Sequence, residues 1–327
     1  MRYYDIALTP QGASAPVKRW TSHPNGIYQP PDPGALNIEF DMLIYREATP
    51  MGASSITVEG IRLQDLMAAT DFAGMQFTMQ GGMGIGLPLA NPRQAGLLLA
   101  GEVFQSFGNW IGTEMNVSFF PMADAHSNDN PANINFMWMA NSSFDSAITV
   151  ALAAAYPGVP VTVNVSPLLT INHDEAHSAQ DIGQLASYLS SLTQGLLGPD
   201  YPGVDIVYQG GGIFVYDGTQ LSVPITIQFN DLVGQPTWIS ANLIQIRTVL
   251  RADIKVGALI ALPLGSPSLP GFVQTTFPSY PSSIKYSAAF TGNFLIQSVR
   301  HVGNYRMPDG NAWVSIFNAV PQVNTSQ

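Results

Sequence analysis

Alternating polar and apolar residues predict β-strands in the first part of the chain. In residues 37–45, NIEFDMLIY, every second side chain is apolar, which is the pattern of a strand with one buried face. Residues 115–119 repeat this alternation, and a shorter candidate lies at residues 3–8. We therefore expect the N-terminal region to be built mainly from strands.

The pattern changes to a helical period within residues 140–200. Apolar residues recur every three or four positions after Ser143 and again after Asp181, which predicts two helices. Ser178 and Asp181 have the spacing of a capping box ahead of the second helix. A short strand-like run separates the two helices, so the segment is predicted to be a helix–strand–helix insert.

Strand-like runs return after residue 200. Residues 225–230 alternate strictly, and two longer runs near the C-terminus are separated by a turn at residues 308–310, Pro-Asp-Gly. The Asp-Gly pair at residues 217–218 is a further hairpin signal. The Pro/Ser-rich stretch at residues 263–283 is too long for a simple hairpin loop.

The order of these patterns predicts a mainly β (α+β) protein with three parts. These are an N-terminal β domain over residues 1–139, a small α/β insert over residues 140–200 and a C-terminal β domain over residues 201–327. The chain is long enough to bury a sizeable core in either one large domain or two ordinary ones.

The composition is poor in charge. Charged residues make up 10% of the 327 residues, against about 25% in a typical soluble domain. A monomer relies on a charged surface to stay soluble, so this composition favours a protein that is largely covered by its neighbours. The 30 glycines and 25 prolines also suit a β-rich chain with many turns.

The net charge is −10, with 22 acidic and 12 basic residues. Nucleic-acid affinity depends mostly on Lys and Arg contacts with phosphate, so a phosphate-gripping surface is disfavoured, whereas a surface past which nucleic acid slides is compatible. There is no cysteine, which excludes disulfides and thiolate chemistry. The N-terminus lacks the apolar run of a signal peptide, and no stretch approaches about 18 consecutive apolar residues, so we expect a soluble chain made in a cytoplasm, without membrane insertion.

Two segments resemble metal sites. His173 and His177 are four residues apart and would share one face of a helix, as zinc requires, but Asp174 stands where a metalloprotease helix has glutamate. The pair also precedes the predicted cap at Ser178, which favours a solvated loop. The polar cluster at residues 124–130 lacks the spaced ligands and distal Glu of an EF-hand, so an exposed turn is favoured over an ion site.

No pattern of catalysis stands out. The glycine run at residues 81–86 lacks the spacing of a dinucleotide or phosphate loop, which favours a β-bulge or a tight packing segment. There is no G-x-S-x-G motif, whereas paired carboxylates for sugar hydrolysis depend on spatial separation and stay open. We assign no catalytic, cofactor-binding or metal-binding residue. Four tryptophans lie in strand-like runs, where packing in the core or in an interface is favoured over a carbohydrate platform: Trp110, Trp138, Trp238 and Trp313.

The most specific signal lies in residues 225–320. It consists of FNDLVGQPTWI, then RADIKVGALIALP, and the closing GNFLIQSVRHVGNYRMPDGNAWVSIFNAV. These motifs resemble those of baseplate hub and related tail proteins of contractile-tailed bacteriophages. The matching positions are Arg251, Asp253, Gly257, Pro263, Gly292, Phe294, Ile296, His301, Gly303, Arg306, Trp313 and Phe317. No lysozyme, peptidase or spike motif accompanies the match.

The resemblance implies a virion structural protein of a myovirus, without enzymatic activity or cofactors. Each chain would have two tail-tube-like β-barrel domains with the α/β insert between them. Three copies would form a ring, the baseplate hub, which joins the sixfold tail tube to the threefold spike and leaves a channel for DNA. The implied partners are further copies of this chain, the tail tube protein, the central spike protein and the baseplate wedge proteins. The protein would be assembled in the host cytoplasm and located in the tail baseplate of the virion.

Four residues of the matching region have structural interpretations. Arg251 and Asp253 lie two apart on a predicted strand and would pair with a neighbouring subunit or with groups in their own surroundings. For His301, a hydrogen bond within the final hairpin is favoured over a switch. Trp313 would pack as a large ring in a closing strand, so that its removal impairs assembly.

Three alternatives stay open. Within the same class, the protein would be a tail-tube adaptor or a baseplate wedge component. In other classes, it would be a carbohydrate-binding or hydrolysing β protein that uses exposed tryptophans, or a metal-dependent enzyme built around His173 and His177. A stable monomer that binds glycans would contradict the hub.

Overall fold

A computed structural model describes residues 1–46, 53–86, 91–122, 131–198, 200–219, 223–263 and 292–322. The predicted mainly β fold is confirmed, because strands predominate over helices among these residues and most of the strands belong to a single large sheet. The polar cluster at 124–130 lies outside the described residues, and so does the predicted loop at 263–283 apart from Pro263.

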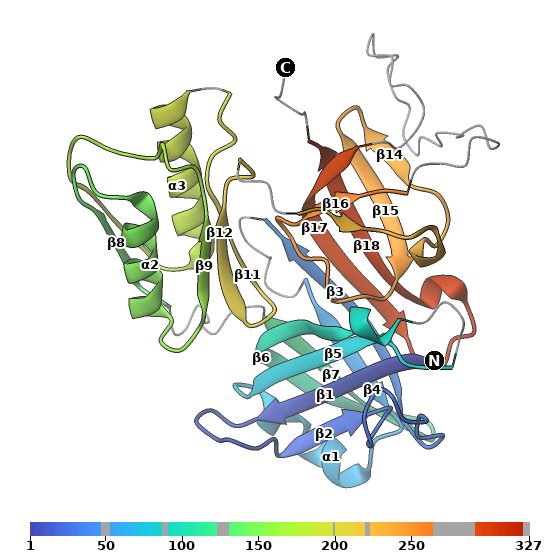
Figure 1. Ribbon diagram of the computed structural model, residues 1–327. Helices are drawn as coiled ribbons and strands as arrows, with labels where there is room; N and C mark the ends of the chain where they lie inside the picture. Colours follow the sequence, from blue (N-terminus) through green and yellow to red (C-terminus); the bar gives the residue numbers. More distant parts are fainter. Residues whose placement is uncertain are drawn as a thin grey trace, which may run out of the picture.

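The large sheet has thirteen strands in two halves (Figure 1). The N-terminal half consists of β1 (Arg2–Thr9), β2 (Lys18–Thr21), β3 (Asn37–Tyr45), β4 (Ser55–Glu59), β5 (Gln76–Met83), β6 (Gly96–Ile111) and β7 (Glu114–Met122). The C-terminal half consists of β13 (Ile225–Thr226), β14 (Thr237–Ser240), β15 (Leu243–Val249), β16 (Leu259–Ala261), β17 (Asn293–Asn304) and β18 (Trp313–Pro321). Short helical turns connect some of them: α1 (Leu63–Met67), η1 (Ala69–Phe72), η2 (Pro92–Gln94), η3 (Phe229–Asp231) and η4 (Gly310–Ala312).

The two halves are joined through β3 and β17. These strands are antiparallel and remain in register from Tyr45 opposite Ser298 to Glu39 opposite Asn304. The strand order is β14-β15-β18-β17-β3-β4-β7-β6-β5-β1-β2, with β13 and β16 attached beside β17. This path is open at β14 and β2, so the described residues contain no closed barrel.

An α/β module occupies the middle of the chain (Figure 1). Its elements are β8 (Ile134–Trp138), α2 (Phe144–Ala155), β9 (Val161–Asn164), β10 (Glu175–Ala179), α3 (Ile182–Leu197), β11 (Asp205–Gln209) and β12 (Gly212–Tyr216). β8 pairs with β10, and β12 lies between β9 and β11. The module's buried cluster extends from Ile134 to Val215 and is therefore wider than the predicted insert at 140–200. The division of the chain into domains stays a prediction.

Both predicted helices of this module are confirmed, but the second begins differently. Ser143 caps α2 by accepting a hydrogen bond from the Ser146 amide, as the sequence suggests. Asp181 caps α3 and accepts a 2.8 Å hydrogen bond from the Gln184 amide. The predicted capping box at Ser178 is wrong, because Ser178 lies in β10. None of the described helices has both the length and the hydropathy needed to span a membrane.

Two predicted features of the C-terminal region differ in the structure. Of the alternating residues 225–230, only Ile225–Thr226 form a strand, because the Asp231 carboxylate accepts a hydrogen bond from the Gln228 amide and begins a helical turn. The Asp-Gly pair at 217–218 follows β12 and makes no hairpin. The turn at 308–310 is confirmed, since β17 and β18 flank it as an antiparallel pair.

Alternation along the strands gives the sheet a buried inner face and an outer face. The inner face packs into one cluster in the N-terminal half and another in the C-terminal half. The outer face combines polar and apolar side chains, most of them partly exposed. Its polar residues across β15, β18, β17, β3, β4, β7 and β6 include Gln245, Arg247, Asn318, Arg300, Glu39, Asp41, Thr57, Asn116, Ser118 and Asn109, and apolar residues such as Leu43, Val302, Ile316 and Phe107 lie among them.

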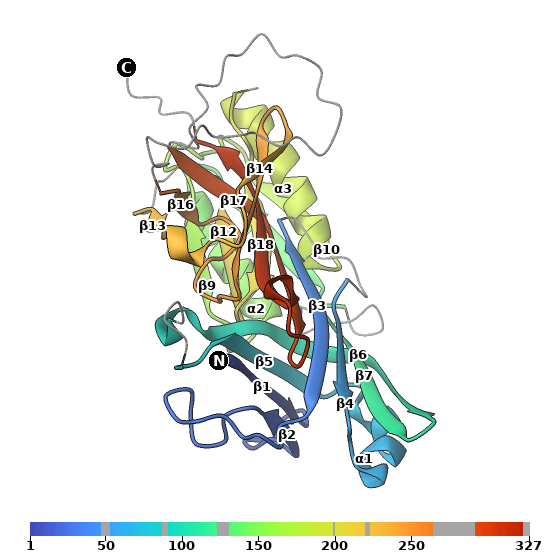
Figure 2. The ribbon, with the colours of Figure 1, turned by 90° about the vertical axis from the view of Figure 1, so that its right-hand side faces the viewer.

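The α/β module is attached to the C-terminal half by an amide pair. The Gln209 side chain donates to the Val256 carbonyl at 2.8 Å and accepts from the Val256 amide at 2.9 Å. Tyr216 packs in the buried cluster of the C-terminal half. Figure 2 shows β3, β17 and β18 in front of the module, so the module leaves the junction between the two halves uncovered on this side.

Candidate functional site

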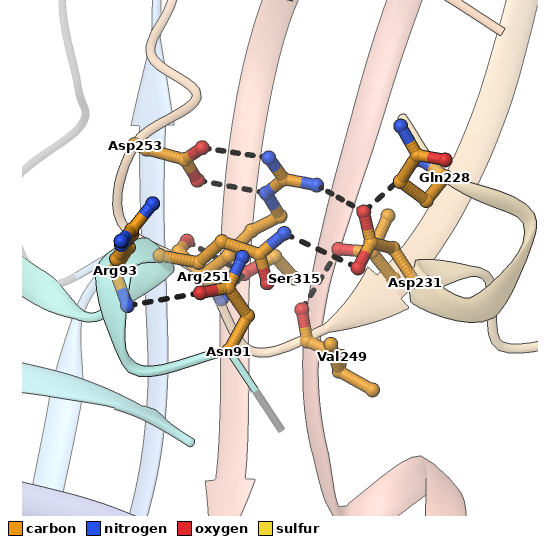
Figure 3. Close-up of polar contacts among 10 residues, drawn as sticks. Asn91, Arg93, Gln228, Asp231, Val249, Arg251, Asp253 and Ser315 are labelled. Atoms are coloured by element: carbon orange, nitrogen blue, oxygen red, sulfur yellow. Dashed lines mark hydrogen bonds and ion pairs between the residues drawn. The ribbon is translucent and has the colours of Figure 1, made fainter. Parts of the chain in front are cut away.

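A buried arginine lies where the two halves of the sheet meet (Figure 3). Arg251 follows β15, and its side chain is 2% exposed. Its Nε and Nη2 donate to the two carboxylate oxygens of Asp253 at 2.7 and 2.6 Å, while Nη1 donates to Asp231 at 3.0 Å. The Asp231 side chain is also buried, so this charge pair is almost removed from water.

The network includes a residue of the N-terminal half. Gln94, in the turn between β5 and β6, donates from Nε2 to the second Asp231 oxygen at 3.2 Å. The Gln94 carbonyl accepts from the Ala252 amide at 2.7 Å. Asp231 therefore receives donors from both halves of the sheet, and this links their relative positions.

Ser315 of β18 extends the network to the final hairpin. Its hydroxyl accepts from the Arg251 amide at 3.0 Å and donates to the Arg251 carbonyl at 3.1 Å. His301 of β17 contacts the same hydroxyl through Nδ1 at 2.8 Å, which confirms the predicted hydrogen bond within the hairpin. Complete burial lowers the pKa of His301 to about 3, so the ring is neutral at pH 7.

We name the Arg251 network as Gln94, Asp231, Arg251, Asp253, His301 and Ser315. Arg251 and Asp253 do not lie on a strand as predicted, because β15 ends at Val249 and the chain turns there. This turn lets the two side chains pair directly. Removing one partner of a buried ion pair generally costs about 3–5 kcal/mol, since the remaining charge has no water to solvate it. The network is therefore suited to fixing the junction.

Trp313 provides a further contact between the halves. It begins β18, is 3% exposed and donates from Nε1 to the Gly82 carbonyl of β5 at 2.8 Å. Its ring packs edge-on against Phe40 of β3, with 5.1 Å between ring centroids. Gly303 lies between these rings, and a Cβ there would come within 2.2 Å of Phe40, which explains the glycine of the matching motif.

The glycine run at 81–86 serves packing. A Cβ at Gly81 would lie 2.5 Å from the Leu98 side chain, and one at Gly82 would lie 2.4 Å from Ala95. A register shift between β5 and β6 occurs immediately before the run. These contacts confirm the interpretation of the glycine run as a tight packing segment beside a β-bulge.

The structure does not place His173 and His177 on a helix. His177 lies in strand β10 and stacks on Tyr188 with 3.7 Å between ring centroids, whereas His173 precedes the strand. His173 Nε2 lies 3.2 Å from Glu175, and the Tyr188 hydroxyl donates to the other Glu175 oxygen at 2.5 Å. The helical geometry that the zinc alternative requires is therefore absent, and the described residues contain no group of three or more ligands suited to a metal ion.

Three of the four tryptophans pack inside the protein, and one does not. Trp138 and Trp313 are buried, and Trp238 packs against Phe294. Trp110, on β6, is 61% exposed, and its Nε1 donates to the Gly112 carbonyl in the hairpin that follows. Packing in the core therefore does not apply to Trp110, whereas packing in an interface stays a prediction.

No protein-family model and no curated protein matches this sequence. The fold is similar to that of three solved structures. The 43 kDa tail protein of prophage MuSo2 from Shewanella oneidensis aligns with a TM-score of 0.51 at 10% identity, over 97% of this chain and 98% of that chain. The tail protein from Neisseria meningitidis MC58 aligns with a TM-score of 0.50 at 9% identity, over 98% and 97%.

The third structure is the Escherichia coli c3393 protein. It is described as a component of the type VI secretion system with structural similarity to the T4 bacteriophage tail proteins gp27 and gp5. It aligns with a TM-score of 0.50 at 10% identity, over 98% of this chain and 77% of that chain. The resemblance to hub-like tail proteins that the C-terminal motifs indicate is thus confirmed at the level of the fold.

Proposed function

We propose that this chain is a non-enzymatic structural subunit of the tail baseplate hub in a contractile-tailed bacteriophage. Three copies form a ring in the virion that joins the sixfold tail tube to the threefold central spike. The wedge proteins contact its periphery, and DNA passes through its channel. The fold shared with phage tail proteins and with a type VI secretion component supports this role.

The observation that carries the proposal is the outer face of the sheet. This surface runs from β15 to β6 across both halves and combines polar side chains with apolar ones such as Leu43 and Ile316. Its cations are few, and Arg300 is paired with Asp41 on the same face. In a ring, such a surface would line the channel. DNA would move past it without being held, because phosphate is bound mainly by unpaired Lys and Arg.

The two halves of each chain would let a ring of three chains match both the threefold spike and the sixfold tail tube. Each half contributes its own curved part of the sheet, so three chains supply six such units. In the C-terminal half, a bridge from Leu232 to Thr248 brings the segment after β13 beside β15, which favours a tube-like barrel. We infer that residues 1–133 and 217–327 form the two tube-like domains and that residues 134–216 form the module between them.

Mass measurement in solution and imaging of the assembled particle test the hub. We expect a trimer or ring in solution and three copies on the particle axis, between tube and spike. Six copies at the periphery would instead identify a wedge component, and copies only within the tube would identify an adaptor. A stable monomer absent from particles would contradict all three roles.

The exposed Trp110 favours one candidate of another class, a carbohydrate-binding surface, because a bare indole ring stacks on sugars. Glycan-array binding compared between the native chain and Trp110→Ala tests it. Binding by a monomer that is lost in the variant would favour the carbohydrate role over the hub.

A further inference from the structure

A small cavity of about 250 Å³ lies at the end of the sheet where β3 begins, β4 ends and β7 begins. Small-molecule sites are usually about 300–1,000 Å³, whereas one water occupies about 30 Å³. The cavity is thus small for a cofactor and large for a single water. Its size suits one long side chain.

The cavity combines an apolar floor with an acidic rim. Leu36 and Met115 line it and pack against the buried cluster of the N-terminal half. The Met115 carbonyl accepts hydrogen bonds from the amides of Gly60 and Ile61, which fixes the floor. Glu59 of β4 and Glu114 of β7 supply carboxylates, and Asn116 adds an amide.

The cations of the described chain leave these carboxylates unneutralised. Glu59 accepts from the Asn37 amide at 2.8 Å, and neither it nor Glu114 takes part in an ion pair among the described residues. Arg306 also lines the cavity, but its Nη2 donates to the Ala35 carbonyl at 2.5 Å. The two carboxylates outnumber the one guanidinium among the described lining residues, so a second cation would complement the net negative charge of the cavity.

We propose that this cavity is a socket for an arginine side chain of a neighbouring protein. The methylene stem of arginine would lie on Leu36 and Met115, while the planar guanidinium offers five N–H donors to the separated acceptors of the rim. Lysine has a compact, strongly hydrated charge that serves fewer acceptors in fixed directions. That the neighbour is another tail subunit rests on the proposed function, but the chemistry of the socket does not.

Titration with N-acetyl-arginine amide, followed through the methyl resonance of Met115, tests the socket. N-acetyl-citrulline amide is the matched neutral probe, because it has nearly the same shape without the charge. Since an exposed ion pair contributes up to about 1 kcal/mol and two carboxylates take part, we expect the arginine probe to bind about threefold to tenfold more tightly. Glu59→Gln and Glu114→Gln should each reduce this preference.

Glu39→Gln, on the outer face and outside the cavity, is the matched control and should leave the preference unchanged. Equal binding of the two probes would overturn the socket, and so would an undiminished preference in both cavity variants that keep the native methyl spectrum. These outcomes are independent of ring formation. A trimer that ignores the arginine probe contradicts the socket alone, and a monomer that binds it contradicts the hub alone.

Discussion

Near the junction of the sheet halves, two arginines form ion pairs with carboxylates, one pair buried and the other exposed. Arg251, on the inner face, is 2% exposed and pairs with Asp231, which is 7% exposed. Arg300, on the outer face, is 50% exposed and pairs with Asp41, which is 39% exposed. An arginine–aspartate pair is therefore removed from water on the inner face of the sheet and accessible to water on the outer face.

Water decides the difference. On the outer face, water and salt screen the pair, and such pairs usually contribute about 0–1 kcal/mol. On the inner face, each charge depends on its protein partners, so the Arg251 network tolerates little change. We infer that the inner face fixes the relative position of the halves, while the outer face is free to meet other molecules.

Trp313→Ala is expected to have the largest effect. It removes a buried ring between the halves, at a cost of about 3–5 kcal/mol, and it also removes the hydrogen bond to Gly82, at about 1 kcal/mol. Urea unfolding measures the loss, and particle assembly should fail with it. Trp110→Ala is the matched control, because its exposed ring should change the unfolding free energy by no more than about 0.5 kcal/mol. Similar losses of unfolding free energy in the two variants would contradict the distinction between the buried and the exposed ring.

Arg251→Met and Arg300→Met compare the two ion pairs directly. The first leaves Asp231 buried without its cation and should lower the free energy of unfolding by about 3–5 kcal/mol. The second leaves Asp41 in water and should cost at most about 1 kcal/mol. Equal losses in the same denaturation experiment would show that burial does not separate the pairs.

His301 makes the inner face sensitive to acid. Its pKa is lowered to about 3 by burial, whereas an unfolded histidine titrates near 6.5. Between these values the unfolded chain binds a proton that the folded chain does not, so the native protein loses about 1.4 kcal/mol per pH unit as the pH falls from 6.5 towards 3. His301→Gln removes this contribution.

The difference in unfolding free energy between the native chain and His301→Gln isolates this effect, since both contain the same carboxylates. We expect the variant to have the shallower pH dependence below pH 6.5. Parallel curves would mean that His301 takes up its proton at the same pH in the folded and unfolded chains, and would contradict the lowered pKa.

Sequence patterns predict the local parts of this fold well. The strand at 37–45, the two helices and the final turn follow from period, caps and turn residues, which act over a few positions. Gly303 and Trp313 can also be recognised as motif positions in the sequence. The physical reason for these residues is their contact with Phe40, which forms only when β17 pairs with β3, a strand far away in the sequence.

The Arg251 network could be predicted only in part for the same reason. Arg251, Asp253 and His301 attract attention in the sequence because they are positions of the motifs that resemble tail proteins. Gln94 and Asp231 have no such signal, because they lie 137 positions apart and meet only when both halves are folded. The helical spacing of His173 and His177 was misleading, since pairing with β8 makes that segment a strand.

The outer face should show the smallest effect on stability. Thr57 of β4 and Ser118 of β7 share a 3.0 Å hydrogen bond between their hydroxyl groups, on a surface that water reaches. In Ser118→Ala, water replaces the lost partner, so the free energy of unfolding should change by less than about 1 kcal/mol. Ser315→Ala is the buried counterpart, because its hydroxyl serves Arg251 and His301, and it should cost more. If Ser118→Ala were as damaging as Ser315→Ala, the outer face would be a part of the folding core rather than a surface left for assembly.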